Sequence, residues 1–532
     1  MLRSLLSGTV LMAVSLTMLT PRGQPRPPAP GRSAEGQGAP ERPRATVDTT
    51  EVAQKGRTNP VPSGGNLQAA LETANLGDRI ELEPGGTYRG PFRLPRKEGS
   101  GWIVISTRAS RSSLVPGRRV SPSDAPSMAK LVSSSSRGVV VADPAAHHYR
   151  LVGLEIAPSD GVFLRALVQL GASETDADAL PHHIVIDRCY LHGDRERGAR
   201  RGIALNSRDS AVVDSYLSDF KEVGADSQAI AGWNGPGPFK IANNHLEAAG
   251  ENVMFGGADP SIEGLVPADI EIVRNQMTKP LAWRVGDDHF QGVQWSIKNL
   301  FELKNARRVL IDGNLFEYNW PNAQNGFAIL LTPRNQDGNA PWSVVEDVTF
   351  VNNAVRHVAA GINILGSDDI HKSQPTRRIV IANNLFLDVG GRWGNGRLFQ
   401  LLDGTSNVTI DHNTAFQTDT AVFGGDRAPH LRFVFENNVV LHNRYGIIAS
   451  GTASGRATLD HYFPAAVVRR NVIIGARADE YPRDNFFPKS VEEAGLAGLQ
   501  SGDYRPAAST PYRHAGTDGR DVGADLSLIP SH

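Results

Sequence analysis

The sequence predicts an all-β protein, a single-stranded right-handed parallel β-helix with three short strands in each coil. Three observations lead to this prediction. A short apolar segment ending in asparagine recurs along the chain, two further short apolar segments follow each copy, and no stretch shows helical periodicity of comparable strength. A chain of 532 residues can bury a large core, and its 54 glycines and 34 prolines suit a backbone that turns often.

The recurring segments place apolar alternation ahead of the asparagine, as in FKIANN, which ends at Asn244, and VLIDGN, which ends at Asn314. Because stacked coils lie about 4.8 Å apart, asparagines at one phase should form a ladder of side-chain hydrogen bonds. Asparagine also tolerates left-handed backbone angles, which favours a tight turn there. The other copies end at Asn275, Asn353, Asn384, Asn413, Asn438 and Asn471.

The only cysteine, Cys189, ends the segment IVIDRC and so occupies a ladder position. We therefore predict a buried small side chain there rather than a nucleophile. A single cysteine also excludes an intramolecular disulfide, so packing and backbone hydrogen bonds must hold the fold together.

The N-terminal region divides into three predicted parts. Arg3 precedes an apolar run that is typical of an export signal, which predicts a signal peptide at 1–22 and a secreted or periplasmic protein with no membrane span after cleavage. An uncleaved anchor is the alternative. Residues 23–58 are rich in proline, glycine and arginine and predict a disordered linker. The β-helix domain is then expected at 59–532, with an N-terminal capping helix after Asn66 and an irregular C-terminal closure.

The charge balance points to no global electrostatic partner. Lysine and arginine number 55, against 56 aspartates and glutamates. This favours neither nucleic acid nor an anionic membrane, so a charged partner must be recognised locally. We expect a monomer.

Three features together resemble secreted bacterial right-handed parallel β-helix proteins of the pectate-lyase-like superfamily, over about residues 60–528. They are NLQAALETANLGDRIELEPGGTY, the asparagine ladder, and AGTDGRDVGADL near the C-terminus. The resemblance implies a polysaccharide as partner. It does not identify one activity, because this superfamily includes lyases, hydrolases, epimerases, esterases and proteins of unknown activity.

The segment FELKN places a lysine at the end of a predicted strand. Alternation sends Phe301 and Leu303 into the core and turns Glu302 and Lys304 outward. Arg334 falls at the matching place one coil later, and a lysine beside an arginine gives up its proton more readily because like charges repel. Cleavage of a uronate glycan by β-elimination needs a base for the C5 proton and a cation for the carboxylate, so Lys304 and Arg334 are the predicted catalytic pair. The alternative is Lys304 paired with Glu302 on a solvated face.

This pair resembles the chondroitinase-B and alginate-lyase group of β-helix enzymes, which implies a polysaccharide lyase with Lys304 as base and Arg334 assisting. Those lyases hold calcium with acidic residues shortly before the lysine. The matching stretch here, 295–299, contains no carboxylate, so calcium is left open as a cofactor.

A second candidate is acidic. Asp368 and Asp369 lie side by side and Asp403 follows one coil later, as an inverting glycoside hydrolase would require. Aspartate after glycine or serine is also ordinary turn chemistry. A non-catalytic glycan-binding β-helix is the further alternative.

Predicted substrate-binding residues lie on the outward stripe of the third strands or on loops beside it. Aromatic rings there can stack on sugar rings, although a loop folded back over the wall explains the tryptophans equally well. No histidines have a metal-ligand spacing such as H-E-x-x-H, so no metal site is predicted. The predicted binding residues are Glu302, Asn363, Gln400, Trp233, Trp283 and Trp320.

Overall fold

The computed structural model describes residues 38–108, 114–496, 504, 507 and 509–529. The compact unit that contains the β-structure begins at Ala39. The predicted signal peptide, 1–22, and residues 23–37 of the predicted linker lie outside the described residues. Among the helices of the described part, none is long and apolar enough to cross a membrane.

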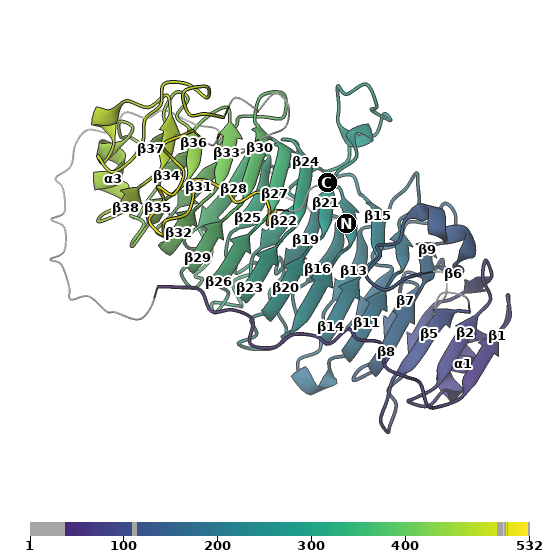
Figure 1. Cartoon of the computed structure of the whole chain (residues 1–532). Coiled ribbons are helices and arrows are strands. Elements are labelled where there is room, and N and C mark those ends of the chain that lie inside the picture. Colours follow the sequence, from purple (N-terminus) through teal and green to yellow (C-terminus); the bar gives the residue numbers. More distant parts are fainter. Residues whose placement is uncertain (1–37, 109–113, 497–503, 505–506, 508, 530–532) are drawn as a thin grey trace, which may run out of the picture. The chain divides into compact units, whose positions relative to one another are not determined.

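The described strands form three parallel sheets that run the length of this unit (Figure 1). The 14 strands of sheet A are β1 (Thr58–Val61), β2 (Arg79–Leu82), β5 (Ile103–Thr107), β8 (His147–Val152), β11 (His182–Asp187), β14 (Arg208–Val213), β17 (Phe239–Ala242), β20 (Ala268–Val273), β23 (Ala306–Asp312), β26 (Val345–Val351), β29 (Arg377–Ala382), β32 (Ser406–Asp411), β35 (Val434–Glu436) and β38 (Val467–Arg469). The 13 strands of sheet B are β3 (Thr87–Arg89), β6 (Ala129–Ser133), β9 (Leu154–Pro158), β12 (Tyr190–His192), β15 (Tyr216–Phe220), β18 (His245–Ala248), β21 (Gln276–Thr278), β24 (Leu315–Asn319), β27 (Ala354–Val358), β30 (Leu385–Val389), β33 (Thr414–Gln417), β36 (Val439–Leu441) and β39 (Val472–Ile474).

The 12 strands of sheet C are β4 (Phe92–Leu94), β7 (Val140–Ala142), β10 (Val168–Leu170), β13 (Arg201–Leu205), β16 (Gln228–Gly232), β19 (Glu251–Phe255), β22 (Phe301–Leu303), β25 (Phe327–Leu331), β28 (Ala360–Leu365), β31 (Phe399–Leu402), β34 (Val422–Gly424) and β37 (Ile447–Ala449). The described helices are α1 (Leu67–Thr73) and α3 (Arg456–Tyr462), with short 3-10 turns η1 (Pro122–Ser127), η2 (Ala177–Ala179), η3 (Leu281–Trp283) and η4 (Ala478–Glu480).

Along most of the chain each coil supplies one strand to each sheet, and the three sheets enclose one apolar core. In β23, Val309 and Ile311 point inward and pair with Val348 and Phe350 of the next coil. Burying such side chains in every coil provides the main driving force for stacking. The predicted right-handed parallel β-helix is confirmed.

The predicted capping helix is α1. Asn66 caps it by accepting a 3.0 Å hydrogen bond from the Ala69 amide, and Leu67 and Leu71 are buried. The helix packs against β1 and β4, the first strands of sheets A and C, and therefore covers the end of the apolar core.

The predicted asparagine ladder is also confirmed. From Asn244 onward, each ladder side chain donates from Nδ2 to Oδ1 of the ladder residue one coil later, at 2.9–3.0 Å. The structure adds one rung, Asn485, which accepts from Asn471 at 2.9 Å. Asn485 follows no recognisable apolar repeat, so the sequence pattern did not reveal it.

The left-handed backbone does not fall on the ladder asparagine itself, contrary to our prediction. It falls on the residue before it, with φ between 49° and 64° in all ten coils from Arg188 to Arg470. This explains why the preceding position carries Asn243, Asn352, Asn383 and Asn437, since asparagine visits this region at low cost.

Residues 39–57, which fall within the predicted disordered linker, run along sheet A in extended form. The amide of Glu41 donates to Asp347 at 3.0 Å, and the amide of Arg44 donates to Asp269 at 2.9 Å. Val47 is buried in a small apolar cluster on the same side. Composition predicted disorder, but the arm is held by hydrogen bonds from its backbone, for which composition gives no signal.

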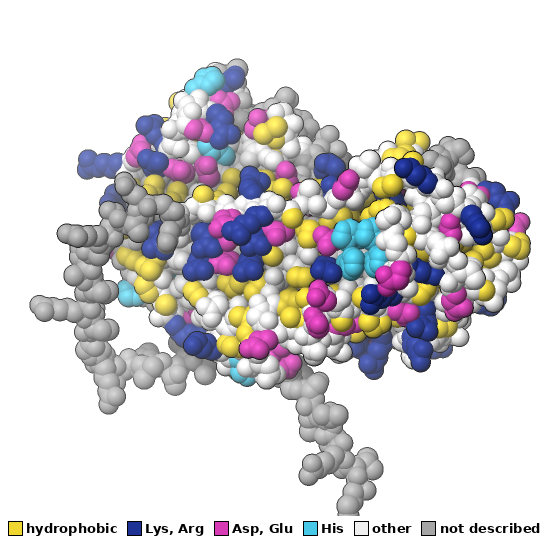
Figure 2. Space-filling view, turned by 90° about the horizontal axis from the view of Figure 1, so that it is seen from below, with side chains coloured by type: hydrophobic (Ala, Val, Ile, Leu, Met, Phe, Trp, Pro, Cys, Tyr) yellow, Lys and Arg dark blue, Asp and Glu magenta, His cyan; other side chains and the backbone are white. Residues whose placement is uncertain are grey.

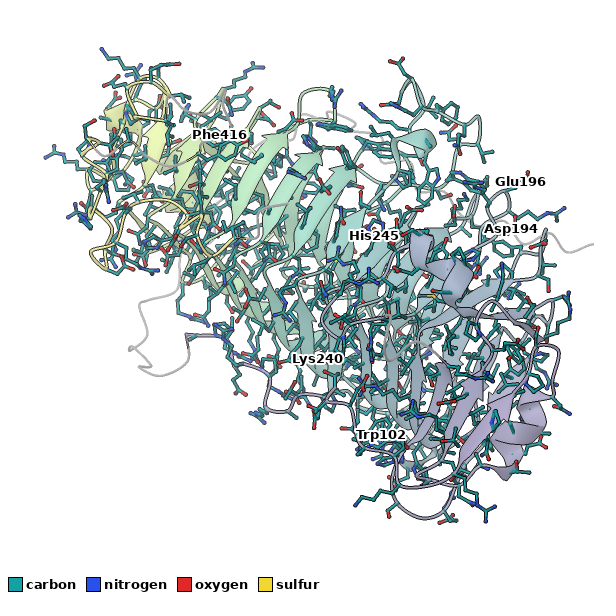
Figure 3. The ribbon with its side chains drawn as sticks, turned by 45° about the vertical axis from the view of Figure 1, so that its right-hand side comes forward. Trp102, Asp194, Glu196, Lys240, His245 and Phe416 are labelled. Atoms are coloured by element: carbon teal, nitrogen blue, oxygen red, sulfur yellow. The ribbon has the colours of Figure 1, made fainter. Side chains whose placement is uncertain are left out.

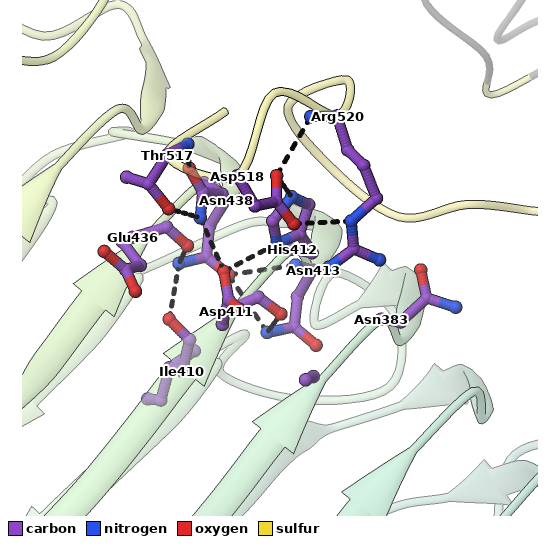
Figure 4. A network of polar contacts seen from close by, with 12 residues as sticks. Asn383, Ile410, Asp411, His412, Asn413, Glu436, Asn438, Thr517, Asp518 and Arg520 are labelled. Carbon is purple, nitrogen blue, oxygen red and sulfur yellow. Dashed lines mark hydrogen bonds and ion pairs between the residues drawn. The ribbon is translucent and has the colours of Figure 1, made fainter. Parts of the chain in front are cut away.

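The C-terminal segment runs back along the β-helix beside the ladder turns rather than only closing the end. The Gly523 amide donates to the carbonyl of Asn437, and the Asp525 amide donates to Asn383 at 2.6 Å. Figure 4 shows the part of this segment around Asp518, which faces His412. Near the C-terminal end, α3 buries Leu459 against the apolar core.

Candidate functional site

The outer face of sheet C carries the groups with unusual electrostatics. Outward residues of consecutive strands stand in register, so that Met254 of β19 lies opposite Glu302 of β22, and Asn363 of β28 lies opposite Gln400 of β31. As predicted, Phe301 and Leu303 enter the core. Glu302 points outward but is only 1% exposed, so it is a buried carboxyl beneath the surface rather than a solvated one.

Glu251 at the start of β19 is the centre of a buried acid–base cluster. It is 0% exposed and accepts a 2.7 Å hydrogen bond on Oε2 from the Gln228 amide. Its Oε1 has no hydrogen-bond partner among the described residues, and the nearest cation is Lys298 Nζ at 3.7 Å. Burial, reinforced by the charges of Asp226 and Glu302, raises the pKa of Glu251 to about 7.

Two lysines lie over these carboxyls. Lys298 Nζ is 2.6 Å from Asp226, and Lys304 Nζ is 3.5 Å from Glu302. The Asn299 side chain donates to Glu302 at 3.2 Å. We call Asp226, Gln228, Glu251, Lys298, Glu302 and Lys304 the sheet C cluster. It combines a carboxyl that is half-protonated near neutral pH with cations that reach the surface.

Local backbone geometry places Lys304 at this point. Its amide donates to the carbonyl of Phe255 in the previous coil at 2.7 Å. Gly256, with φ of 95°, makes this approach possible, because a Cβ there would lie 2.7 Å from the amide nitrogen of Asn305.

Lys304 and Arg334 lie on consecutive coils as predicted, and the Arg334 amide donates to the Lys304 carbonyl at 2.9 Å. Their side chains serve different partners. The Arg334 guanidinium binds Asp368 at 2.6 Å and Asp369 at 2.9 Å, so two carboxylates compensate its charge. The predicted mechanism relied on repulsion between Arg334 and Lys304, and the two aspartates compensate the charge that would cause it. Glu302 is the ion-pair partner of Lys304, as in the alternative interpretation.

The aspartates of the predicted acidic constellation are paired with arginines and backbone amides. Asp368 accepts hydrogen bonds from the amides of Asn335 and Ile370, which is the turn chemistry weighed above. Asp403 forms a two-point ion pair with Arg427, at 2.9 and 2.6 Å, and this contact lowers the pKa of Asp403. A general acid requires a raised pKa, so Asp403 lacks the property that the prediction requires.

Two arginines on this face remain available for an anion. Arg201 lies 5.1 Å from the Trp233 ring centroid, and Arg397 lies 3.9 Å from that of Phe423. Their hydrogen-bond partners are the neutral side chains of Gln228 and Gln400, and neither guanidinium forms an ion pair with a carboxylate of the described residues. Gln400 in turn donates to Asn363 at 2.9 Å, so this predicted binding pair is in contact.

The predicted tryptophan platform is largely internal. Trp283 and Trp320 are 3% and 5% exposed and pack in one cluster with Trp295 and Trp393. The Lys221 ammonium lies 5.4 Å from the Trp283 ring centroid. The tryptophans at the base of the loop after η3 are therefore packed against the wall, whereas Val285 and Val293 within the loop are exposed. Trp233 is the predicted tryptophan that stays partly exposed on the sheet C side.

Calcium, which the lyase resemblance left open, does not fit the sheet C cluster. Calcium takes six to eight oxygen ligands. The unpartnered buried oxygens here are Glu251 Oε1 and Asn299 Oδ1, and the Lys298 ammonium already lies beside the first of them. Glu251, Gln228 and Lys298 were not predicted, because the first two are ordinary polar residues at strand starts, Lys298 lies in the segment before β22, and only stacking brings them together.

No protein-family model and no curated protein sequence matches the chain. Similar solved structures include the catalytic unit of the thermostable GH87 alpha-1,3-glucanase from Streptomyces thermodiastaticus strain HF3-3, with a TM-score of 0.50 and 13% identity, covering 84% of this chain and 72% of that one. The PL6 family alginate lyase AlyGC gives 0.44 and 13%, covering 89% and 57%. An alginate lyase from Paenibacillus sp. str. FPU-7 gives 0.31 and 14%, covering 75% and 97%. At these identities the likeness concerns the fold alone, and the chain has a right-handed parallel β-helix fold.

Proposed function

We propose that the protein is a carbohydrate-active enzyme that cleaves a uronate-containing polysaccharide by β-elimination on the outer face of sheet C. The observation that carries the proposal is the sheet C cluster, in which Lys304 lies over the buried carboxyls of Glu302 and Glu251. A buried carboxyl with a strongly raised pKa beneath a lysine that reaches the surface is a combination typical of catalytic sites.

The shape and charge of the face suit an acidic polymer. Twelve parallel strands at a spacing of about 4.8 Å give a wall about 50 Å long. Arg201 and Arg397 lie on this wall with neutral partners, so each can bind a carboxylate without first breaking an ion pair. A chain of uronates would present carboxylates to both.

In β-elimination the base removes the C5 proton, a double bond forms between C4 and C5, and the C4–O bond breaks. The leaving oxygen takes up a proton. Lys304 would take the C5 proton as a neutral amine, and Glu302, 3.5 Å from its Nζ, would pair with the ammonium that forms. Glu251, with a pKa of about 7, holds a proton that the cluster can return.

A second candidate is glycoside hydrolysis, with Glu251 rather than the predicted aspartates as the acid. The raised pKa of Glu251 beside a second carboxyl, Glu302, favours it. Hydrolysis yields reducing ends without an unsaturated uronate, whereas elimination yields both.

The test incubates the purified full chain with alginate, polygalacturonate, chondroitin, hyaluronan and a neutral α-glucan. Ultraviolet absorbance of the unsaturated uronate and reducing ends are followed in parallel. We expect both signals on one acidic glycan, and a loss of at least about 100-fold in kcat/KM for Lys304→Met.

The matched control is Lys372→Met, which removes an exposed lysine outside the cluster and should leave activity unchanged. Circular dichroism must show that each variant is folded. Reducing ends without absorbance would replace elimination by hydrolysis. Glycan binding without any product would refute catalysis and leave a binding protein.

A further inference from the structure

Four histidines from two neighbouring coils form a separate cluster on the outer face of sheet A. His147 and His148 begin β8, His182 and His183 begin β11, and His182 lies opposite His147. The rings of His147 and His182 stack at 4.9 Å between centroids, and those of His148 and His183 at 4.4 Å, both at 10°. Figure 2 shows histidines gathered in one compact group on this face.

The ring nitrogens lie as close as ligands of one metal ion. Within each dipeptide the two Nδ1 atoms are 2.8 Å apart. One ring nitrogen each from His148, His182 and His183 lie within 4.8 Å of one another. Two nitrogens bound to one zinc ion, each about 2.0–2.1 Å from it, stand roughly 3 Å apart. Little movement of the rings is therefore needed to place three of them around an ion.

A neighbouring backbone group already orients part of the cluster. His147 Nε2 lies 2.8 Å from the carbonyl of Lys97, to which it must donate, so the lone pair of this neutral ring is on Nδ1 and faces His148. Such carbonyl contacts fix the tautomer of metal-binding histidines. Asp209 Oδ2, 3.8 Å from His183 Nδ1, adds an oxygen at the edge.

The backbone turns both rings of each dipeptide outward. Successive side chains of a regular strand point to opposite faces. His148 and His183 have φ of 58° and 53°, which interrupts the alternation and brings each beside its neighbour. The same bend recurs in later coils, where Asp269 and Arg308 form an ion pair instead. The backbone is therefore the same in these coils, and only the histidine side chains distinguish β8 and β11 from the later strands.

We propose that His148, His182 and His183 form a binding site for a divalent transition metal ion of the zinc class. Imidazole nitrogen suits zinc, copper and nickel, and an ordinary histidine is neutral at pH 7.5. The ion joins β8 to β11 beside Trp102, whose ring lies 5.1 Å from that of His148 and which Figure 3 labels on the N-terminal coils. The site differs from the sheet C cluster in sheet, residues and chemistry, and it does not depend on the proposed enzyme activity.

The test uses the full chain purified without a polyhistidine tag and stripped with EDTA. Zinc chloride is titrated into it by calorimetry at pH 7.5. We expect one ion per chain and a melting temperature that rises with zinc concentration, because the ion binds the folded state. In the His148→Gln/His182→Gln/His183→Gln variant both effects should disappear, whereas His514→Gln, which changes an exposed histidine elsewhere, should keep them.

Cobalt(II) provides a second measurement that does not depend on stability. The intact chain should bind it with visible absorption typical of nitrogen ligation, and the triple variant, if folded by circular dichroism, should not. Absence of zinc binding by the intact chain would overturn the proposal. So would a stoichiometry that is equal in the intact chain and the triple variant.

Discussion

The asparagine ladder and the sheet C cluster are both rows of buried polar groups, yet they differ in how completely those groups are paired. Asn353 in the ladder donates to Asn384 and to two backbone carbonyls, and accepts twice from Asn314. Glu251 in the cluster leaves one carboxylate oxygen without a hydrogen bond. Buried polar groups that make all their hydrogen bonds stabilise the fold. A buried carboxyl with an unpaired oxygen instead has a shifted pKa, a property that catalytic groups share.

The largest expected effect on stability is in the ladder. Asn353→Ala removes the acceptor of two Asn314 hydrogen bonds and the donor to Asn384 in one buried turn. We expect a loss of about 3–5 kcal/mol in the free energy of unfolding, measured by urea denaturation with tryptophan fluorescence. Asn339→Ala, at an exposed position, is the control and should change stability by less than about 0.5 kcal/mol. Equal effects of the two substitutions would contradict a structural ladder.

The next largest effect is expected for Glu251→Gln in the sheet C cluster, which should change activity without changing folding. Glu251→Gln keeps the shape of the side chain and its contact with Gln228 while removing the titrating proton. In the proposed reaction, we expect kcat/KM to fall at least about 100-fold with no loss of folding. A variant that stays fully active would show that Glu251 is not part of the chemistry.

A smaller effect is the pH dependence of stability. Burial raises the pKa of Glu251 to about 7, above its unfolded value, so the folded chain binds more protons between these two pKa values. The stabilising contribution is complete below the unfolded pKa and is lost as pH rises through 7. Glu251→Gln should therefore gain on the order of 1–3 kcal/mol over the wild type between pH 5 and pH 8, in urea unfolding at each pH. If the difference in unfolding free energy between the variant and the wild type did not change with pH, Glu251 would already be ionised at pH 5.

The same contrast explains what the sequence could reveal. A ladder residue is needed in every coil, so its repetition exposes the β-helix, its turns and the buried position of Cys189. Lys304 was visible because it interrupts an apolar segment. Glu251 and Lys298 were hidden, since stacking of coils far apart in sequence makes them neighbours, and the charge of Arg334 proved to be satisfied by aspartates that had been assigned to another mechanism. Because the loops differ in length, the distance between two residues along the sequence does not predict whether their side chains touch.

The smallest expected effect concerns Cys189, near the N-terminal end of the ladder row. Its amide donates to the hydroxyl of Ser215 at 3.0 Å, the position that an asparagine fills in later coils, and burial raises the pKa of its thiol to about 12. Cys189→Ser should cost only about 1 kcal/mol, and the native thiol should resist an aromatic disulfide reagent until urea unfolds the chain. Labelling in the native state would show that this coil opens before the rest. The serine side chain of Ser215 is shorter than asparagine and makes fewer hydrogen bonds to the neighbouring coils. Opening of this coil would therefore show that the ladder is weakest where serine replaces asparagine.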